Sequence, residues 1–146
     1  MDRPEVGMPF EEKSAIVTTG AHVVVFGVYF LVVARWLAST AADDVVYQPL
    51  LVFTIVPLVV VTAVGHVVLA IRNPKEAGRS DERDRLIGLR GGRVGGFVLA
   101  VGVFFGIAFA MAELSPFYIT HVLLLAWVLA EVTDGTRKIV LYRRGA

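Results

Sequence analysis

The stretch RNPKEAGRSDERDRLIGLRGGR, residues 72–93, is the only long polar run in a chain that is otherwise almost continuously apolar. It carries seven cations and four anions. An excess of cations in a short loop is typical of the cytoplasmic side of a bilayer. We therefore expect residues 72–93 to form a cytoplasmic loop between two hydrophobic helical hairpins.

The composition favours a membrane protein over a soluble domain. Of the 146 residues, 56% are hydrophobic and 18% are charged, whereas soluble domains average about 45–50% and about 25%. The net charge is +1, and no zinc-finger spacing or basic recognition helix is present, so nucleic acid is not an expected partner. The chain has no cysteine, so it has no thiolate for a disulfide, an iron–sulfur cluster or thiol catalysis.

The apolar runs predict an all-α, polytopic membrane protein with four transmembrane helices in an up-down bundle. A helix needs about twenty apolar residues to cross a bilayer. The expected helices cover residues 14–38, 48–71, 94–112 and 116–134, within one transmembrane domain of residues 1–146. Four crossings place both termini in the cytoplasm. Of the fourteen Lys and Arg residues, thirteen then lie on the cytoplasmic side and only Arg35 lies outside, as expected for the cytoplasmic (inner) membrane.

Local signals predict where these helices begin, bend and end. Ser80 and the acids after it are expected to cap a short surface helix that ends at Gly91–Gly92. Pro57 removes a backbone donor and is expected to kink the second helix, with a nearby Thr or a neighbouring helix compensating. Gly135 is expected to break the fourth helix and leave a basic, amphipathic tail. The leader before residue 14 has more acids than bases, unlike a signal peptide.

The cations of the loop have two interpretations. In the first, they are solvated charges that only set the topology. In the second, they bind anionic lipid headgroups or dock a cytosolic protein. The residues that would do so are Arg79, Arg83, Arg85, Arg90 and Arg93.

The third expected helix is rich in small residues at helical spacing. One stripe contains Gly95, Gly102, Gly106 and Ala110, and a second, about 100° around the helix, contains Gly92, Gly96 and Ala100. Small residues at this spacing let helix backbones approach closely. Two stripes predict two close neighbours. Both are helices of the same chain, or one stripe is the contact face of a homo-oligomer; a flat cofactor against the backbone is a further alternative.

Three ionisable residues, His22, His66 and Glu131, lie within apolar runs, where such side chains are costly. At a rise of about 1.5 Å per residue, all three are expected at a similar depth, about 10 Å from the cytoplasmic end. They are therefore candidates for one shared site between three helices.

Three interpretations of this site remain open. The histidines are neutral and hydrogen-bond to Thr, to Glu131 or to the backbone. Alternatively, His22 and His66 are the axial ligands of a b-type haem, a chemistry that suits histidines on facing helices. In the third interpretation, the two imidazoles and the carboxylate bind a divalent metal such as zinc or iron, or relay protons. Nearby, Tyr29 is expected to donate to His22 or to Glu131, and His121 is expected to be solvated at the outer interface.

Four segments resemble a loose group of small, actinobacterial-type membrane proteins of unknown function. These segments are FEEKSAIV before the first span, GHVVLAI at the end of the second, PKEAGRSDERDRLI in the loop and KIVLYRRG in the tail. The resemblance implies a four-helix membrane protein with a regulatory or stress role. It implies no ligand, activity or residue role.

Together, these patterns favour a non-enzymatic function. The chain lacks a nucleophile elbow, a P-loop, an HExxH motif and a dinucleotide fingerprint. We expect a small accessory or regulatory subunit that contacts membrane lipids and assembles with itself or with a partner membrane protein. The alternatives are an electron-transfer protein that holds haem b between His22 and His66, and an oligomeric small transporter or proton pathway that uses His66 and Glu131.

Overall fold

The computed structural model describes residues 10–72 and 82–144, except for the side chains of residues 10, 66, 69, 70 and 72. The described part of the chain is helical. It contains α1 (Phe10–Leu37), a short 3-10 helix η1 (Ala42–Asp44), α2 (Gln48–Arg72), α3 (Glu82–Met111) and α4 (Pro116–Arg144). Each of the four α-helices is long and apolar enough to cross a membrane, and the chain is therefore described as a multi-pass membrane protein.

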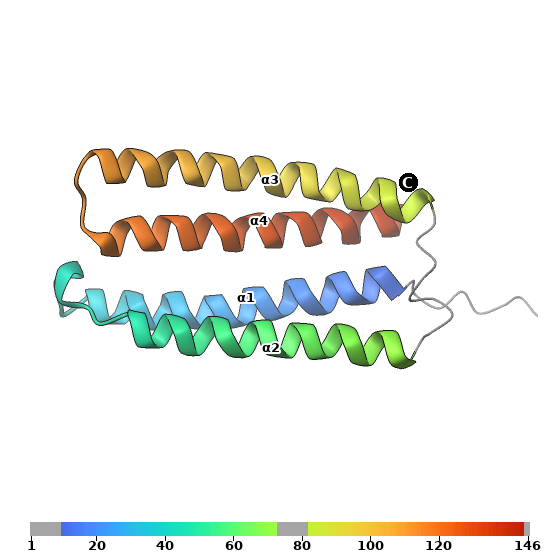
Figure 1. Cartoon of the computed structure of the whole chain (residues 1–146), viewed down its shortest axis with the longest axis horizontal. Helices are drawn as coiled ribbons and strands as arrows, with labels where there is room; N and C mark the ends of the chain where they lie inside the picture. Colours follow the sequence, from blue (N-terminus) through green and yellow to red (C-terminus); the bar gives the residue numbers. More distant parts are fainter. Residues whose placement is uncertain (1–9, 73–81, 145–146) are drawn as a thin grey trace, which may run out of the picture.

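The helices form a bundle in which α1 packs between α2 and α4, and α4 packs between α1 and α3 (Figure 1). The start of α1, the end of α2, the start of α3 and the end of α4 lie at one end of the molecule, here called the loop end. The opposite end, here called the turn end, holds η1 and the connection between α3 and α4. All four α-helices therefore reach both ends of the molecule.

The contact between α3 and α4 depends on glycine. Gly91, Gly95, Gly102 and Gly106 are the buried glycines of α3, and all four face α4. A Cβ at Gly95 would lie 2.9 Å from the carbonyl oxygen of Ala130, and a Cβ at Gly102 would overlap Ala126. The backbones can approach this closely only because these side chains are missing, and in a membrane such close approach is what holds helices together.

The contact between α1 and α4 is built mainly from large apolar side chains. Phe26, Tyr29 and Val33 of α1 are almost fully buried and belong to the same core cluster as Leu124 and Val128 of α4. Near the loop end the two helices are in close contact at Gly135 of α4, where Thr19 of α1 occupies the space that a Cβ would take. α2 joins this core through Leu58 and partly buried neighbours, while most of its surface is exposed.

The observed ends of α3 and α4 correct the sequence-based boundaries. The third helix begins at Glu82 rather than at residue 94, and it continues through Gly91–Gly92, where we expected a short helix to stop. The fourth helix continues through Gly135 to Arg144 rather than ending at residue 134. Gly91 and Gly135 are positions of close helix contact, so packing offsets the low helix propensity of glycine there. Residues 82–93 are thus helical and not a loop.

Other expected features differ in smaller ways. α1 begins at Phe10, four residues before the expected start. α2 is helical on both sides of Pro57. The hydroxyls of Thr54 and Thr62 donate to the carbonyls of Leu50 and Leu58, so these bonds do not replace the one that Pro57 removes at residue 53. The expected helix cap at Ser80 and the expected docking residue Arg79 lie outside the described residues.

Replacement of Gly102 tests the glycine contact. We expect Gly102→Ala to destabilise the protein by about 1–3 kcal/mol, because the new methyl group forces α3 and α4 apart. The matched control is Gly27→Ala in α1, where the Cβ position has nothing within 4 Å. The measurement is the unfolding midpoint of both variants in detergent; equal midpoints would contradict the proposed role of Gly102.

Candidate functional site

His22 lies on the face of α1 that packs against α4. Its side chain is buried, and its Nδ1 donates a hydrogen bond to the Thr18 carbonyl, 2.8 Å away. The ring centroid is 5.9 Å from that of Trp127 in an edge-on contact and 6.1 Å from that of Phe26. His22 therefore fills a place in an aromatic contact between α1 and α4.

This packing bears on the haem interpretation. With Nδ1 bonded to the backbone, Nε2 is the ring nitrogen left for an axial ligand. The buried His22 ring is also in contact with Phe26 and Trp127, whose rings contact each other at 5.5 Å, so a macrocycle at His22 would need room in a packed aromatic contact. The other expected ligand, the side chain of His66, lies outside the described residues.

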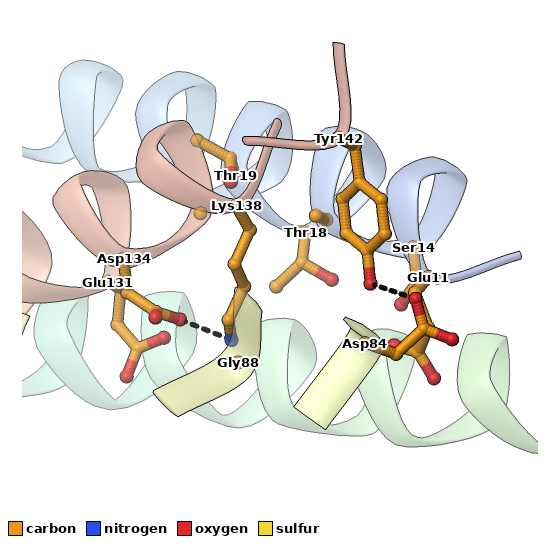
Figure 2. A pocket seen from close by; sticks show the side chains of 12 residues that line it. Glu11, Ser14, Thr18, Thr19, Asp84, Gly88, Glu131, Asp134, Lys138 and Tyr142 are labelled. Atoms are coloured by element: carbon orange, nitrogen blue, oxygen red, sulfur yellow. Dashed lines mark hydrogen bonds and ion pairs between the residues drawn. The ribbon is translucent and has the colours of Figure 1, made fainter. Parts of the chain in front are cut away.

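Glu131, the third residue of the expected site, lines a polar pocket at the loop end (Figure 2). His22 is not among the residues that line this pocket. Among the described side chains, no three His, Asp or Glu residues lie close enough together to hold a metal ion. The structure thus places His22 and Glu131 on the same pair of helices but in different surroundings.

The pocket, here called the loop-end pocket, has a volume of about 250 Å³ and lies between α1, α3 and α4. Its polar lining consists of Glu11, Ser14, Thr18 and Thr19 from α1, Asp84 from α3, and Glu131, Asp134, Lys138 and Tyr142 from α4. Four carboxylates in this lining face a single lysine. The pocket is therefore an acidic, water-accessible space, and its chemistry suits hydrogen bonding and the attraction of cations.

Two contacts between lining residues organise the pocket (Figure 2). Lys138 Nζ lies 2.6 Å from Asp134 Oδ2, one helical turn away on α4. The Tyr142 hydroxyl donates to Asp84 Oδ1 at 3.0 Å and so joins α4 to the first turn of α3. The other oxygen of Asp134, Oδ1, is buried beside Gly91 and has no hydrogen-bond donor among the described residues.

The end of α4 is also fixed to its neighbours outside the pocket. Arg143 Nε lies 3.5 Å from Glu12 Oε1, and the Glu12 side chain is only 7% exposed. Arg83 donates from Nη2 to the Tyr142 carbonyl at 3.4 Å. A buried carboxylate needs such a partner, so the Glu12–Arg143 pair ties the start of α1 to the end of α4.

A second polar cluster lies at the turn end and was not expected from the sequence. Nδ1 of His121 donates to the Phe117 carbonyl at 2.7 Å, which leaves Nε2 to accept from the Tyr29 hydroxyl at 3.0 Å. The ring of His121 also stacks on Phe117 and contacts Tyr47 edge-on. The Tyr47 hydroxyl bonds to Thr120 Oγ1 at 3.1 Å.

These contacts correct two expectations. Tyr29 donates to His121 and not to His22 or Glu131. His121 is partly buried among aromatic rings and is not simply solvated at an interface. The signal in the sequence was the matched depth of Tyr29 and His121 in two helices that run in opposite directions, but depth alone does not show which helices are neighbours.

The small residues of α3 fall into two groups. Gly95, Gly102 and Gly106 contact α4, as described above, while Ala110 of the same expected stripe is exposed. Of the second stripe, Gly92, Gly96 and Ala100 are all exposed, and the Cβ positions of both glycines have nothing within 4 Å. Only one of the two expected neighbours of α3 is thus present in the described part of this chain.

The arginines expected to contact lipid or a partner differ in their surroundings. Arg83 is engaged with the Tyr142 carbonyl at the end of α4. Arg85, Arg90 and Arg93 are exposed on the part of α3 that precedes its apolar segment. These three side chains therefore remain on the molecular surface at the loop end.

Comparisons with known proteins give no assignment: the chain matches no family model, no curated protein and no solved structure. The resemblance to small actinobacterial-type membrane proteins therefore stays a prediction. The functional argument rests on the geometry alone.

Removal of the Tyr29 hydroxyl tests the turn-end cluster. Tyr29 is 1% exposed, so Tyr29→Phe leaves Nε2 of His121 without its donor in a buried setting. We expect a loss of about 1–2 kcal/mol in the free energy of unfolding. Tyr118→Phe, at an exposed position of α4, is the matched control and should change little. The measurement is equilibrium unfolding in detergent; a Tyr29→Phe variant as stable as the control would show that the bond contributes nothing.

Proposed function

We propose that the protein is a small, non-enzymatic accessory or regulatory subunit of the cytoplasmic (inner) membrane. Its four helices cross the bilayer in up-down order, with both termini and the loop-end pocket on the cytoplasmic side. It assembles through the exposed small-residue face of α3, here called the α3 glycine face and defined by Gly92, Gly96 and Ala100. The occupant of this face is a second copy of the chain; a partner membrane protein is the alternative.

The distribution of charge supports this orientation. All Lys and Arg residues except Arg35 belong to the loop-end parts of the helices or to the segments that adjoin them in the sequence. Arg35 is in the last turn of α1, at the turn end. Because Lys and Arg are retained in the cytoplasm during insertion, this bias favours a cytoplasmic loop end.

The lengths of the helices support the position of the pocket. The apolar part of α3, residues 94–111, has eighteen residues and is about 27 Å long, close to the hydrocarbon thickness of a bilayer. Residues 82–93 then extend about 18 Å beyond it. The matching part of α4, residues 134–144, runs beside them and supplies Asp134, Lys138 and Tyr142 to the pocket. Asp84, Asp134, Lys138 and Tyr142 therefore belong to helix segments that extend beyond the apolar part of α3, which favours a pocket at the membrane surface.

The contrast between the two glycine groups of α3 carries the proposal of assembly. Atoms of α4 occupy the space that a side chain would take at four glycines of α3: Gly91, Gly95, Gly102 and Gly106. At Gly92 and Gly96 nothing occupies it. Glycine lowers helix stability relative to alanine by about 1 kcal/mol in soluble helices. At Gly92 and Gly96 no packing contact within the described chain offsets this loss. A second helix packed on the α3 glycine face would supply the missing contact.

The alternative functions fit the described contacts less well. A haem-binding function requires a free approach to His22, and this buried ring contacts both Phe26 and Trp127. The proton pathway was expected to use His66, whose side chain lies outside the described residues, and Glu131. A route along α1 and α4 would connect the loop-end pocket with the Tyr29–His121 pair. The contact between Phe26 and Trp127 lies between these two polar regions along α1 and α4, so it favours a structural role for both.

Cross-linking in native membranes tests assembly on the α3 glycine face. The natural chain has no cysteine, so Ala100→Cys introduces a single thiol on this face. We expect oxidation to produce disulfide-linked dimers. In the same background, Gly96→Leu should reduce the dimer yield at least about ten-fold, because a large side chain blocks the close approach of two helices.

The matched control is Ala108→Leu, which adds the same side chain at another exposed position of α3, about 120° around the helix. It should leave the dimer yield unchanged. Self-assembly on this face would be contradicted if Ala100→Cys alone yields no disulfide-linked dimer. It would also be contradicted if adding Gly96→Leu leaves the dimer yield unchanged.

A further inference from the structure

The outward face of the loop-end part of α3 continues directly into the outward face of its apolar segment. Leu86, Arg90, Arg93 and Phe97 follow one another at spacings of four, three and four residues and therefore share one side of the helix. Phe104, seven residues after Phe97, extends the same side towards the turn end. Because α3 is unbroken from Glu82 to Met111, this surface is continuous.

The apolar half of this surface faces acyl chains. The side chains of Phe97 and Phe104 are 71% and 68% exposed, and they lie in the segment that is apolar enough to cross the membrane. Large apolar side chains at such positions are stable only in contact with lipid tails or with another apolar surface.

The charged half follows immediately. Arg93 directly precedes the apolar segment, and Arg90 lies three residues, about 4.5 Å, further towards the cytoplasm. At this depth the guanidinium groups are at the level of lipid headgroups. Both side chains are exposed, and neither has an ion-pair partner among the described residues. Leu86, also exposed, places an apolar side chain beside them, as expected for a face in the headgroup region.

We propose that Arg90 and Arg93, beneath Phe97, form a binding surface for the headgroup of an anionic phospholipid. Side chains three residues apart on a helix are neighbours, so two guanidinium groups can act on one headgroup. Arginine donates two parallel hydrogen bonds to phosphate oxygens, and the acyl chains of the same lipid then lie along Phe97 and Phe104.

The lipid is favoured over an acidic cytosolic protein because the apolar and cationic parts form one surface across the membrane boundary. A lipid matches both parts, whereas a cytosolic protein would match only the arginines. This surface adjoins the α3 glycine face: Arg90 and Phe97 lie about 100–120° around the helix from Gly96, and Arg93 lies about 60° from it. The lipid site and the proposed self-assembly are tested by different measurements, lipid quenching at residue 97 and cross-linking at residue 100.

Local lipid composition tests the proposal. A bimane label on Phe97→Cys, in full-length protein reconstituted into phosphatidylcholine nanodiscs, reports on lipids at this surface through quenching by spin-labelled phosphatidylglycerol or phosphatidylcholine. We expect spin-labelled phosphatidylglycerol to quench more strongly at equal mole fraction. The double variant Arg90→Gln, Arg93→Gln should lower this preference by about five-fold or more, since each cation near an anionic surface has roughly that effect.

The control variant Arg137→Gln, Arg144→Gln removes the same charge from exposed positions on α4 and should retain the preference. Arg90→Lys, Arg93→Lys keeps the charge and should retain part of it, because lysine lacks the bidentate geometry. All three variants alter only exposed side chains, and circular dichroism verifies their folding. Equal quenching by both lipids in labelled Phe97→Cys protein that retains Arg90 and Arg93, or an equal loss of preference in the α4 control, would overturn the assignment to these two arginines.

Discussion

Glycines of α3 let α4 approach until its atoms occupy the positions where side chains would otherwise stand, and the rest of the bundle depends on this contact. Helices in lipid gain little from hiding apolar surface, so they associate through close packing. The Gly95–Ala130 and Gly102–Ala126 contacts hold the two helices together within the membrane. Gly91 extends the contact beyond the apolar segments, where Asp134 lies against α3. The loop-end pocket exists because this pairing continues beyond the apolar segment of α3.

The sequence predicts the spans well because hydrophobicity over about twenty residues depends little on neighbours. Prediction from the sequence fails where the role of a residue depends on contacts with a neighbouring helix. Gly135 was interpreted as a helix breaker, yet it is a contact point for Thr19. Tyr29 was paired with His22 by its position on α1, yet its partner His121 lies 92 positions away. Spacing gives the face and the depth of a side chain, whereas the identity of the adjacent helix follows only from the packed structure.

The same contrast explains which parts of the candidate site could be foreseen. His22, His66 and Glu131 could be identified because polar side chains in apolar runs are conspicuous. The structure does not bring His22 and Glu131 into one site, and the side chain of His66 lies outside the described residues. His22 packs with aromatic rings, and Glu131 joins a pocket whose other members, such as Asp84 and Lys138, were assigned to a loop or a tail. The molecule therefore offers three surfaces of different chemistry at or near its loop end: an acidic pocket, a small-residue face and a cationic lipid-facing stripe.

The proposed topology depends on one orientation, with the loop end in the cytoplasm. The absence of cysteine from the natural sequence makes this orientation directly measurable. A single cysteine is introduced at Asp43 in η1 or at Arg137 in α4, both exposed positions, and intact spheroplasts are treated with a membrane-impermeant maleimide. The account predicts labelling of Asp43→Cys in intact cells and of Arg137→Cys only after lysis. Labelling of Arg137→Cys in intact cells would contradict it.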